Sequence, residues 1–535
     1  MNTNLFSSSN SRGKTAPAAN TVNEAGGKAY ARTPEAELAQ LAATGCFGNT
    51  FYVTADDQLQ RVLEVAQKCD DDFIARTAVY SRQRGNMKDM PAVLLAILAA
   101  RQSTYLTKAW PLVIDSVKML RNFVQVTRSG VTGRKSFGSR TRRLIREWFA
   151  SHTPESLFKQ SLGSNPSVGD IIKMVHPKPD TDTRAMTYAY LMGKEVTARG
   201  VLPQILQDYL AFRESPATQG IPPINFQFLS SLPLTKGQWT SVCLSSSWTT
   251  LRMNLNTFQR HGVFEDARVV KQVAARLVDA AEIRKSRTMP YQVFSAYKHV
   301  GAEMPAGIVQ ALAKASDLCL TNIPDLPDNL VIGVDVSGSM DSPITGSRGT
   351  VTSAMKCVDV AALFASALAA KCPTARVIPF DTSAHTFRMH GSVVDTANAL
   401  SKFGGGGTNC SIPIKMAAES GKPVDAIIIF SDNESWYCNN PTSYRATGSQ
   451  QAWQEVRAKN PNAKLVCIDL TPSTSTQVVD DGSVANVGGF SDAVFDFLAQ
   501  FLSANGKDWV KVIRATSLEG KAPVVEVAQD SSEES

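Results

Sequence analysis

Two patterns of hydrophobic positions divide this 535-residue chain near residue 325. From Thr33 to about Asp317, apolar residues recur every three or four positions, which is the spacing of a buried helix face. Beyond the proline-containing connector 322–329, short continuous apolar runs alternate with helical stretches. The first pattern predicts an all-helical region, and the second predicts an α/β domain whose parallel sheet is covered on both faces.

Helix-start signals are frequent in the first region. Thr33 before a proline, Thr54 before acidic residues and Ser167 three residues before an aspartate each predict a helix N-terminus. Residues 90–100 are apolar on nearly every side and predict a buried helix, while residues 267–283 predict a single amphipathic helix. Helical pairs at intervals of roughly 40 residues favour a HEAT-like solenoid, although no clean sequence repeat is present.

The second region reads as a doubly wound, Rossmann-like α/β domain. Its expected strands are residues 330–334, 375–380, 426–430 and 464–470. Its expected helices are residues 353–370, 412–419, 450–459 and 491–502.

These patterns divide the chain into four expected parts. Residues 1–29 are predicted to be a disordered tail, because they are rich in Asn, Ser, Ala and Gly. Residues 30–325 form the helical-repeat domain and residues 326–510 the α/β domain. Residues 511–535 form a C-terminal tail that either packs back on the helical region or is disordered at its acidic end.

Polar side chains follow the expected strands of the α/β domain. Asp335, Ser337 and Ser339 follow the first strand, the loop Gly404–Asn409 precedes a helix, and Asp432 follows the third strand. Ligands of open α/β sheets bind outside the carboxyl ends of strands. Because carboxylate and hydroxyl oxygens are hard ligands, we predict a Mg²⁺ site there, with Mn²⁺ as another suitable ion. Each string alone is also compatible with an ordinary turn or helix cap.

The composition excludes several classes of protein. With 43% hydrophobic residues the chain is not mainly disordered, and no run of 18 apolar residues predicts a membrane span. No apolar stretch near the N-terminus predicts a secretory signal. The nine cysteines are odd in number and form no CxxC pair, so we expect buried free thiols and a reducing, cytoplasmic location.

The charge is unevenly spread along the chain. Residues 1–330 carry 39 basic and 27 acidic side chains, whereas residues 331–535 carry 16 basic and 21 acidic ones. Between Arg101 and Arg146, eleven basic residues face a single acid, Asp115. A solvated helix face is the usual explanation of such a run, but the near-absence of acids favours binding of nucleic acid or another polyanion.

The strings DVSGSM, GGGGTN and IIIFSDNES resemble the metal-ion-dependent adhesion site (MIDAS) of a von Willebrand factor type A domain. That resemblance implies one cation with an open coordination position, in a binding module and not a catalyst. The residues that match the motif are Asp335, Ser337, Ser339, Thr408 and Asp432.

The helical region narrows the family. GRKSFGSRTRRLIREWF (133–149), IIKMVHPKP (171–179) and RTMPYQVFSAYKHV (287–300), followed by an A domain, resemble the Ro autoantigen family, whose helical region is called TROVE. The resemblance covers nearly the whole chain from about residue 30, and we expect a bacterial relative of that family.

The resemblance implies a ring of helical repeats closed by the A domain. Proteins of this family take single-stranded 3′ ends of misfolded RNAs into the ring and hold small noncoding Y RNAs on the outside. Bacterial relatives are linked to RNA turnover with exoribonucleases such as polynucleotide phosphorylase. We therefore expect a monomeric RNA quality-control protein with a Y-like RNA partner and no membrane partner.

Basic residues from three stretches of the helical region are the candidate RNA contacts. They are Arg134, Lys135, Arg140, Arg142, Arg143 and Arg146; Lys159, Lys173, His176 and Lys178; and Arg82, Arg84 and Lys88. The last three are expected to line the ring or to lie in a solvated loop. His176 matches a family histidine that contacts Y RNA, or it caps a helix. Gly163 stands where the family pattern often has a further basic residue.

Catalysis is not expected. The six histidines lie near no patterned nucleophile, and no paired carboxylates stand out. A different class of function remains open from the sequence. In that alternative, the metal site of the A domain captures an acidic protein ligand and the basic helical region has no RNA role.

Overall fold

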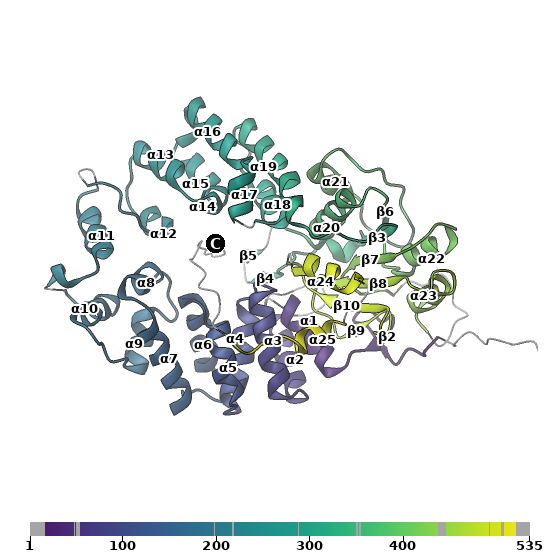
Figure 1. Cartoon of the computed structure of the whole chain (residues 1–535), viewed down its shortest axis with the longest axis horizontal. Helices are drawn as coiled ribbons and strands as arrows, with labels where there is room; N and C mark the ends of the chain where they lie inside the picture. Colours follow the sequence, from purple (N-terminus) through teal and green to yellow (C-terminus); the bar gives the residue numbers. More distant parts are fainter. Residues whose placement is uncertain are drawn as a thin grey trace, which may run out of the picture.

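The computed structural model describes residues 16–520, except 46, 48, 50–53, 197, 217–218, 287, 349–350, 353–354, 437–445, 492 and 504–507. Helices follow one another around a ring, and an α/β domain closes that ring (Figure 1). Neighbouring helices in the sequence pack on one another, as in α3 with α4 and α18 with α19. The multi-domain fold predicted from the sequence, a helical-repeat ring followed by a Rossmann-like A domain, is confirmed.

The first half of the ring contains α1 (Pro34–Thr44), α2 (Ala55–Gln67), α3 (Asp71–Gln83), α4 (Asp89–Ala100), α5 (Tyr105–Val113), α6 (Val117–Ser129), α7 (Ser139–Ser151), α8 (Pro154–Lys159), α9 (Val168–Val175) and α10 (Asp182–Leu191). The second half contains α11 (Gln204–Glu214), α12 (Phe226–Ser230), α13 (Lys236–Ser245), α14 (Trp248–Met253), α15 (Leu255–Arg260), α16 (Ala267–Leu277), α17 (Ala280–Ser286), α18 (Pro290–His299) and α19 (Ala306–Leu318). Short 3₁₀ turns lie at Arg199–Val201, Val263–Glu265, Cys319–Asn322 and Gly338–Asp341.

The predicted helix starts are confirmed where the local signals were strong. Thr33, Thr54 and Ser167 each accept a backbone N–H with the side chain, which satisfies a donor that the helix itself leaves unpaired. The buried helix predicted over 90–100 is α4. The single helix predicted over 267–283 is wrong, because α16 ends at Leu277 and α17 begins at Ala280.

The α/β domain has a parallel five-stranded sheet in the order β10-β8-β7-β3-β6. The strands are β3 (Leu330–Asp335), β6 (Arg376–Phe380), β7 (Ala426–Ser431), β8 (Lys464–Asp469) and β10 (Val484–Gly488). The helices are α20 (Cys357–Lys371), α21 (Val393–Leu400), α22 (Ser411–Glu419), α23 (Gly448–Lys459) and α24 (Ala493–Leu502). A short pair, β4 (Ser347–Arg348) with β5 (Val351–Thr352), precedes α20. The helix predicted over 353–370 therefore begins later, at Cys357.

The N-terminal segment packs on the A domain. The sequence predicted a disordered tail through residue 29, yet β1 (Thr21–Val22) pairs with β2 (Lys28–Ala31), and β2 pairs with β9 (Ser475–Thr476). These strands were missed because β1 is only two residues long and leaves no hydrophobic period, and because β9, the partner of β2, lies more than 400 residues away in the sequence.

The C-terminal helix α25 (Trp509–Arg514) packs on α1 and α3, so the tail predicted to begin at residue 511 starts inside a helix. The Arg514 guanidinium pairs with Asp70 at 2.5 Å and also with Glu35. Both ends of the described chain therefore hold the A domain against the first helices. The acidic end at residues 530–535 lies outside the described residues.

Two sequence predictions concern the whole chain. The seven described cysteines are all free and buried, as expected. Across the described part of the chain, no helix is both long and apolar enough to span a bilayer.

Candidate cation site and candidate RNA-binding surface

Three loops meet at the carboxyl edge of the A-domain sheet. Asp335 ends β3, Asp432 follows β7, and β3 and β7 are neighbours in the sheet. The glycine-rich loop joins them, because the Gly338 N–H donates to the Gly406 carbonyl at 3.1 Å and the Trp436 N–H donates to the Thr408 carbonyl at 3.3 Å. The structure thus brings together the loops that carry all five predicted cation ligands.

The side chains of this site are already held in place by hydrogen bonds. The Ser337 N–H donates to Asp335 Oδ1 at 2.9 Å, and the Ser431 hydroxyl donates to Asp335 Oδ2 at 2.6 Å. The Ser337 and Ser339 hydroxyl oxygens lie 3.3 Å apart, and Ser339 hydrogen-bonds to Asp432. All five predicted ligands are buried. A site held in this way needs little rearrangement to receive a small ion.

The site holds two buried carboxyl groups, those of Asp335 and Asp432, which interact with each other. Burial, together with the negative charge of Asp432, raises the pKa of Asp335 above its usual range, and burial raises the pKa of Asp432. A divalent cation would favour the ionised form of both carboxylates. Two carboxylates and three hydroxyls form an all-oxygen donor set, which fits Mg²⁺ or Mn²⁺. Within the described residues, no group of three or more His, Cys, Asp or Glu side chains offers a different metal site.

Arginines of the helical region fall into two groups, and the first group holds helices together. Arg140 Nη1 donates to the Ser103 carbonyl at 2.9 Å, just beyond α4, and Arg146 Nε donates to the Val175 carbonyl at 2.6 Å, at the end of α9. Arg101 likewise reaches the Ala66 carbonyl at 2.7 Å. These guanidinium groups donate to carbonyls at or just beyond the ends of neighbouring helices, and so tie those helices together. Part of the basic run predicted to bind polyanion therefore has a structural role.

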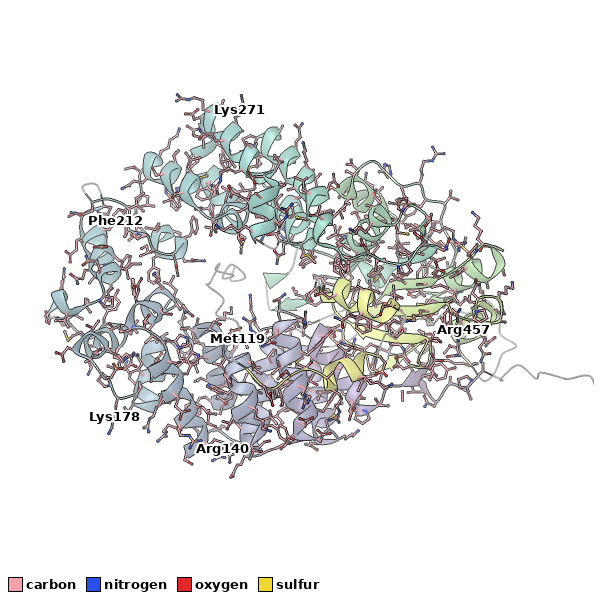
Figure 2. The ribbon with its side chains drawn as sticks, in the orientation of Figure 1. Met119, Arg140, Lys178, Phe212, Lys271 and Arg457 are labelled. Atoms are coloured by element: carbon pink, nitrogen blue, oxygen red, sulfur yellow. The ribbon has the colours of Figure 1, made fainter. Side chains whose placement is uncertain are left out.

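The second group of basic side chains is exposed to solvent, on α7, on α9 and just beyond α9. It forms what we call the outer cationic patch, which consists of Arg142, Arg143, Lys173, His176 and Lys178. Arg142 and Arg146 lie one turn apart on α7, and Arg146 binds the Val175 carbonyl at the end of α9, next to His176. Figure 2 labels Lys178 and Arg140 at the outer edge of the ring.

Little negative charge opposes the outer cationic patch. Arg143 pairs with Glu147 at 3.5 Å, and Lys173 lies 4.0 Å from Asp170, both on exposed helix faces where such pairs are weak. Among the residues that the structure describes, the side chains of Arg142 and Lys178 have no hydrogen-bond or ion-pair partner. Four cations and a histidine are therefore available to an anionic ligand.

The remaining candidates are placed as follows. Arg134 lies over Gly138, and Lys135 is exposed beside Gly130 in the loop before α7. Lys159 pairs with Glu155 at 2.6 Å. Trp148 and Phe149 belong to the core.

His176 is the residue after α9, in a left-handed conformation with φ of 50°, and its backbone N–H donates to Ile172. The helix-capping interpretation is thus confirmed for its backbone, while its exposed ring remains a candidate RNA contact.

Two of the three basic residues near Gly85 form ion pairs. Arg82 donates to both carboxylate oxygens of Asp115, at 2.8 and 3.1 Å, so the single acid of the basic run is used within the ring. Arg84 lies 3.6 Å from Asp496 of α24, across the junction with the A domain. Lys88 is half-buried just before α4.

Two residues near these sites gave no recognisable signal in the sequence. The Arg121 guanidinium fills the space beside Gly163, where a Cβ would lie 2.0 Å from Nη1. It donates to the Pro166 carbonyl at 2.8 Å and to the Leu162 carbonyl at 3.2 Å, and so holds the loop around Gly163. Trp436 is 51% exposed and packs against Gly407 next to the cation site. Sequence spacing could not reveal either neighbour, because each contact joins separate elements.

Comparisons with known proteins agree with the fold and the motifs. Residues 329–502 match the family model of the Ro60 vWA domain. The RNA-binding protein RO60 of Deinococcus radiodurans is 25% identical over 530 residues, which cover 90% of this chain and 94% of that protein. The RNA-binding protein RO60 of Caenorhabditis elegans is 26% identical over 206 residues, which cover 36% of this chain and 31% of that protein.

A solved structure shows the same fold. The crystal structure of the Deinococcus radiodurans RO (RSR) protein superposes with a TM-score of 0.62 at 20% identity, and covers 88% of this chain and 100% of that one. The resemblance to the Ro family that the motifs indicated is confirmed.

Proposed function

We propose, for a chain that resembles the Ro proteins along nearly its whole length, that it binds RNA and acts in RNA quality control or turnover. Its ligands on this proposal are small noncoding Y-like RNAs on the outside of the ring and single-stranded 3′ ends of misfolded RNAs within it. The observation that carries the proposal is the outer cationic patch, whose basic side chains lack strong carboxylate partners. Such side chains bind phosphates and release counterions.

Selection by this mechanism depends on shape and charge. Arg142 and Lys178 would contact the sugar–phosphate chain, which gives affinity without reading the bases. A ring of helices admits a single strand more easily than a duplex, so unpaired ends would be favoured. The proposed RNA ligands therefore share a structured body and a frayed or tailed end.

The A domain has a separate role in the proposal. Asp335, Ser337, Ser339, Thr408 and Asp432 would hold Mg²⁺, which would supply an open coordination position for an oxygen ligand. We propose no catalytic role for this site, since its ligands lie in the acidic part of the chain, apart from the outer cationic patch. Any RNA cleavage would come from a partner 3′-to-5′ exoribonuclease such as polynucleotide phosphorylase, bound to a cytoplasmic monomer.

Salt titration of RNA binding tests the proposal. Purified full-length chain would be mixed with a hairpin RNA that carries a single-stranded 3′ tail and with the same hairpin ended bluntly. We expect affinity for the tailed RNA to be higher, to fall steeply with ionic strength and to survive EDTA. Equal, salt-insensitive binding of the two RNAs, or none at low salt, would contradict it.

One observation favours a second candidate function. Trp436 is a half-exposed aromatic side chain beside the cation site, and aromatic residues are enriched where proteins bind partners. In this alternative, the A domain captures a protein that offers a carboxylate to the cation. Protein capture that EDTA abolishes, together with negligible RNA binding, would support it over the first proposal.

A further inference from the structure

One loop of the A domain joins the cation site to the N-terminal segment. Residues 432–436 follow β7 and begin with the predicted ligand Asp432. The Glu434 N–H donates to Asp432 Oδ1 at 3.2 Å, and the Ser435 hydroxyl accepts from the Cys410 N–H at 3.1 Å. The loop is therefore bonded both to one predicted ligand and to the segment that carries Thr408.

The opposite side of the same loop is covered by the hairpin of β1 and β2. The Ala25 N–H donates to Glu434 Oε2 at 3.1 Å, and the Asn23 side-chain amide donates to the Ser435 carbonyl at 2.9 Å. Gly27 lies so close that a Cβ there would be 2.2 Å from the Ser435 carbonyl oxygen. The hairpin thus contacts two residues of the loop directly, and these contacts leave no space for a side chain at Gly27.

The residue that follows the hairpin adds a buried positive charge. Arg32 is completely buried and pairs with Asp469, the last residue of β8. The carboxylate of Asp480 also lies within the field of Arg32. The carboxyl edge therefore gathers buried carboxylates from several strands and loops. The N-terminal segment brings one cation to this edge, and the predicted metal ion would bring a second.

We propose that cation binding at the A-domain site and docking of the N-terminal hairpin (residues 21–31) are coupled through the loop 432–436. This inference rests on the proposed cation site. When the hairpin is docked, its hydrogen bonds hold the loop in the position that presents Asp432 to the ion. When the ion is bound, Asp432 is fixed and the loop offers Glu434 and Ser435 to the hairpin. Linkage requires the two effects to be equal in free energy.

The coupling would make the cation a stabiliser of ring closure. The hairpin leads directly into α1, which packs against β10, so the same segment joins the first helix of the ring to the A domain. A second contact between the ends of the chain, Arg514 with Asp70 and Glu35, does not involve this loop. The two contacts therefore allow a matched comparison.

The test is a Mn²⁺ titration of the full-length chain by calorimetry, with variants of the hairpin. Gly27→Ala would displace the hairpin from Ser435, and we expect it to weaken Mn²⁺ binding about tenfold or more. Val22→Ala, at an exposed position of the same hairpin, and Arg514→Ala, at the other contact, are expected to bind Mn²⁺ like the wild type. Asn23→Ala is the milder replacement if Gly27→Ala does not fold.

The reciprocal measurement is tryptic cleavage at the exposed Lys28. Mn²⁺ is expected to slow cleavage of the wild type, and to have no effect in Asp335→Ala. Wild-type affinity in both Gly27→Ala and Asn23→Ala, or cleavage that Mn²⁺ does not slow, would overturn the coupling and leave the cation site intact. Failure of the wild type to bind Mn²⁺ would overturn the cation site and the coupling together.

Discussion

The outer face of the helical ring and the carboxyl edge of the A domain use charge in opposite ways. On the ring, Arg142 and Lys178 extend into solvent, and the fold does not depend on them. At the A-domain edge, Asp335 and Asp432 are buried, and each accepts one hydrogen bond from the backbone of its own loop and one from a neighbouring segment. The ring surface is suited to a large, flexible polyanion, whereas the A-domain edge is suited to one small ion.

The number of basic residues in a segment does not by itself show how many of them are available to bind a ligand. The basic run between residues 101 and 146 predicted binding of nucleic acid or another polyanion. In the structure, Arg101, Arg140 and Arg146 donate to backbone carbonyls at or just beyond helix ends, so part of the run holds helices together. The ring therefore uses arginine both to hold helices together and to face solvent. Substitutions in the first group should affect stability, and substitutions in the second group should affect RNA binding.

We expect the largest effect on cation affinity, from the loss of a carboxylate in the A domain. Asp335→Ala removes one of two carboxylate ligands, so we expect Mg²⁺ or Mn²⁺ affinity to fall at least about 100-fold. Affinity for tailed RNA should change less than about twofold, because the outer cationic patch lies on other elements. Calorimetric cation titration and filter binding measure the two quantities. A parallel loss of RNA binding would mean that the two regions do not act separately.

The next effect separates the two groups of arginines on a single helix. Replacing Arg142 and Arg143 of α7 by Ala should weaken RNA binding about tenfold and lower the log–log salt slope by roughly 0.7 per residue. The melting temperature should not change, because both side chains are exposed.

The matched double variant replaces Arg140 and Arg146 by Ala on the same helix. It should lower the free energy of unfolding by about 2 kcal/mol, because charged hydrogen bonds to helix ends are lost at partly exposed positions. Thermal melts and RNA titrations of both double variants decide the matter. If the capping pair reduced RNA affinity more than the exposed pair, the division proposed here would be wrong.

The smallest effect sharpens the description of the outer cationic patch. Glu147→Gln removes the carboxylate 3.5 Å from Arg143 and should raise RNA affinity by about twofold or less, since exposed pairs are weak. Glu155→Gln, which frees Lys159 outside the patch, is the control and should have a smaller effect. A decrease in affinity for Glu147→Gln would show that this carboxylate orders Arg143 for binding.

Local signals predicted much of the A domain. Asp335 and Asp432 follow short apolar strands, and the carboxyl ends of parallel strands meet at one edge, so their proximity followed from the pattern. The N-caps Thr33, Thr54 and Ser167 were equally readable, because a cap acts on residues two or three positions away. The contacts of Arg32, Gly27 and Trp436 could not be predicted from the sequence, because their partners are distant along the chain.

By itself the sequence determined the element types, the two-region architecture, the loops of the cation site and the excess of positive charge in the helical region. The contacts of Arg140 and Arg146 with carbonyls near helix ends, and the exposure of the Arg142 side chain, became evident only from the packed structure. The same holds for the position of the N-terminal hairpin against the loop after β7. The physical reason is range. Helix periodicity and capping act within one or two turns, whereas the partner of a guanidinium or a glycine is chosen when distant segments pack.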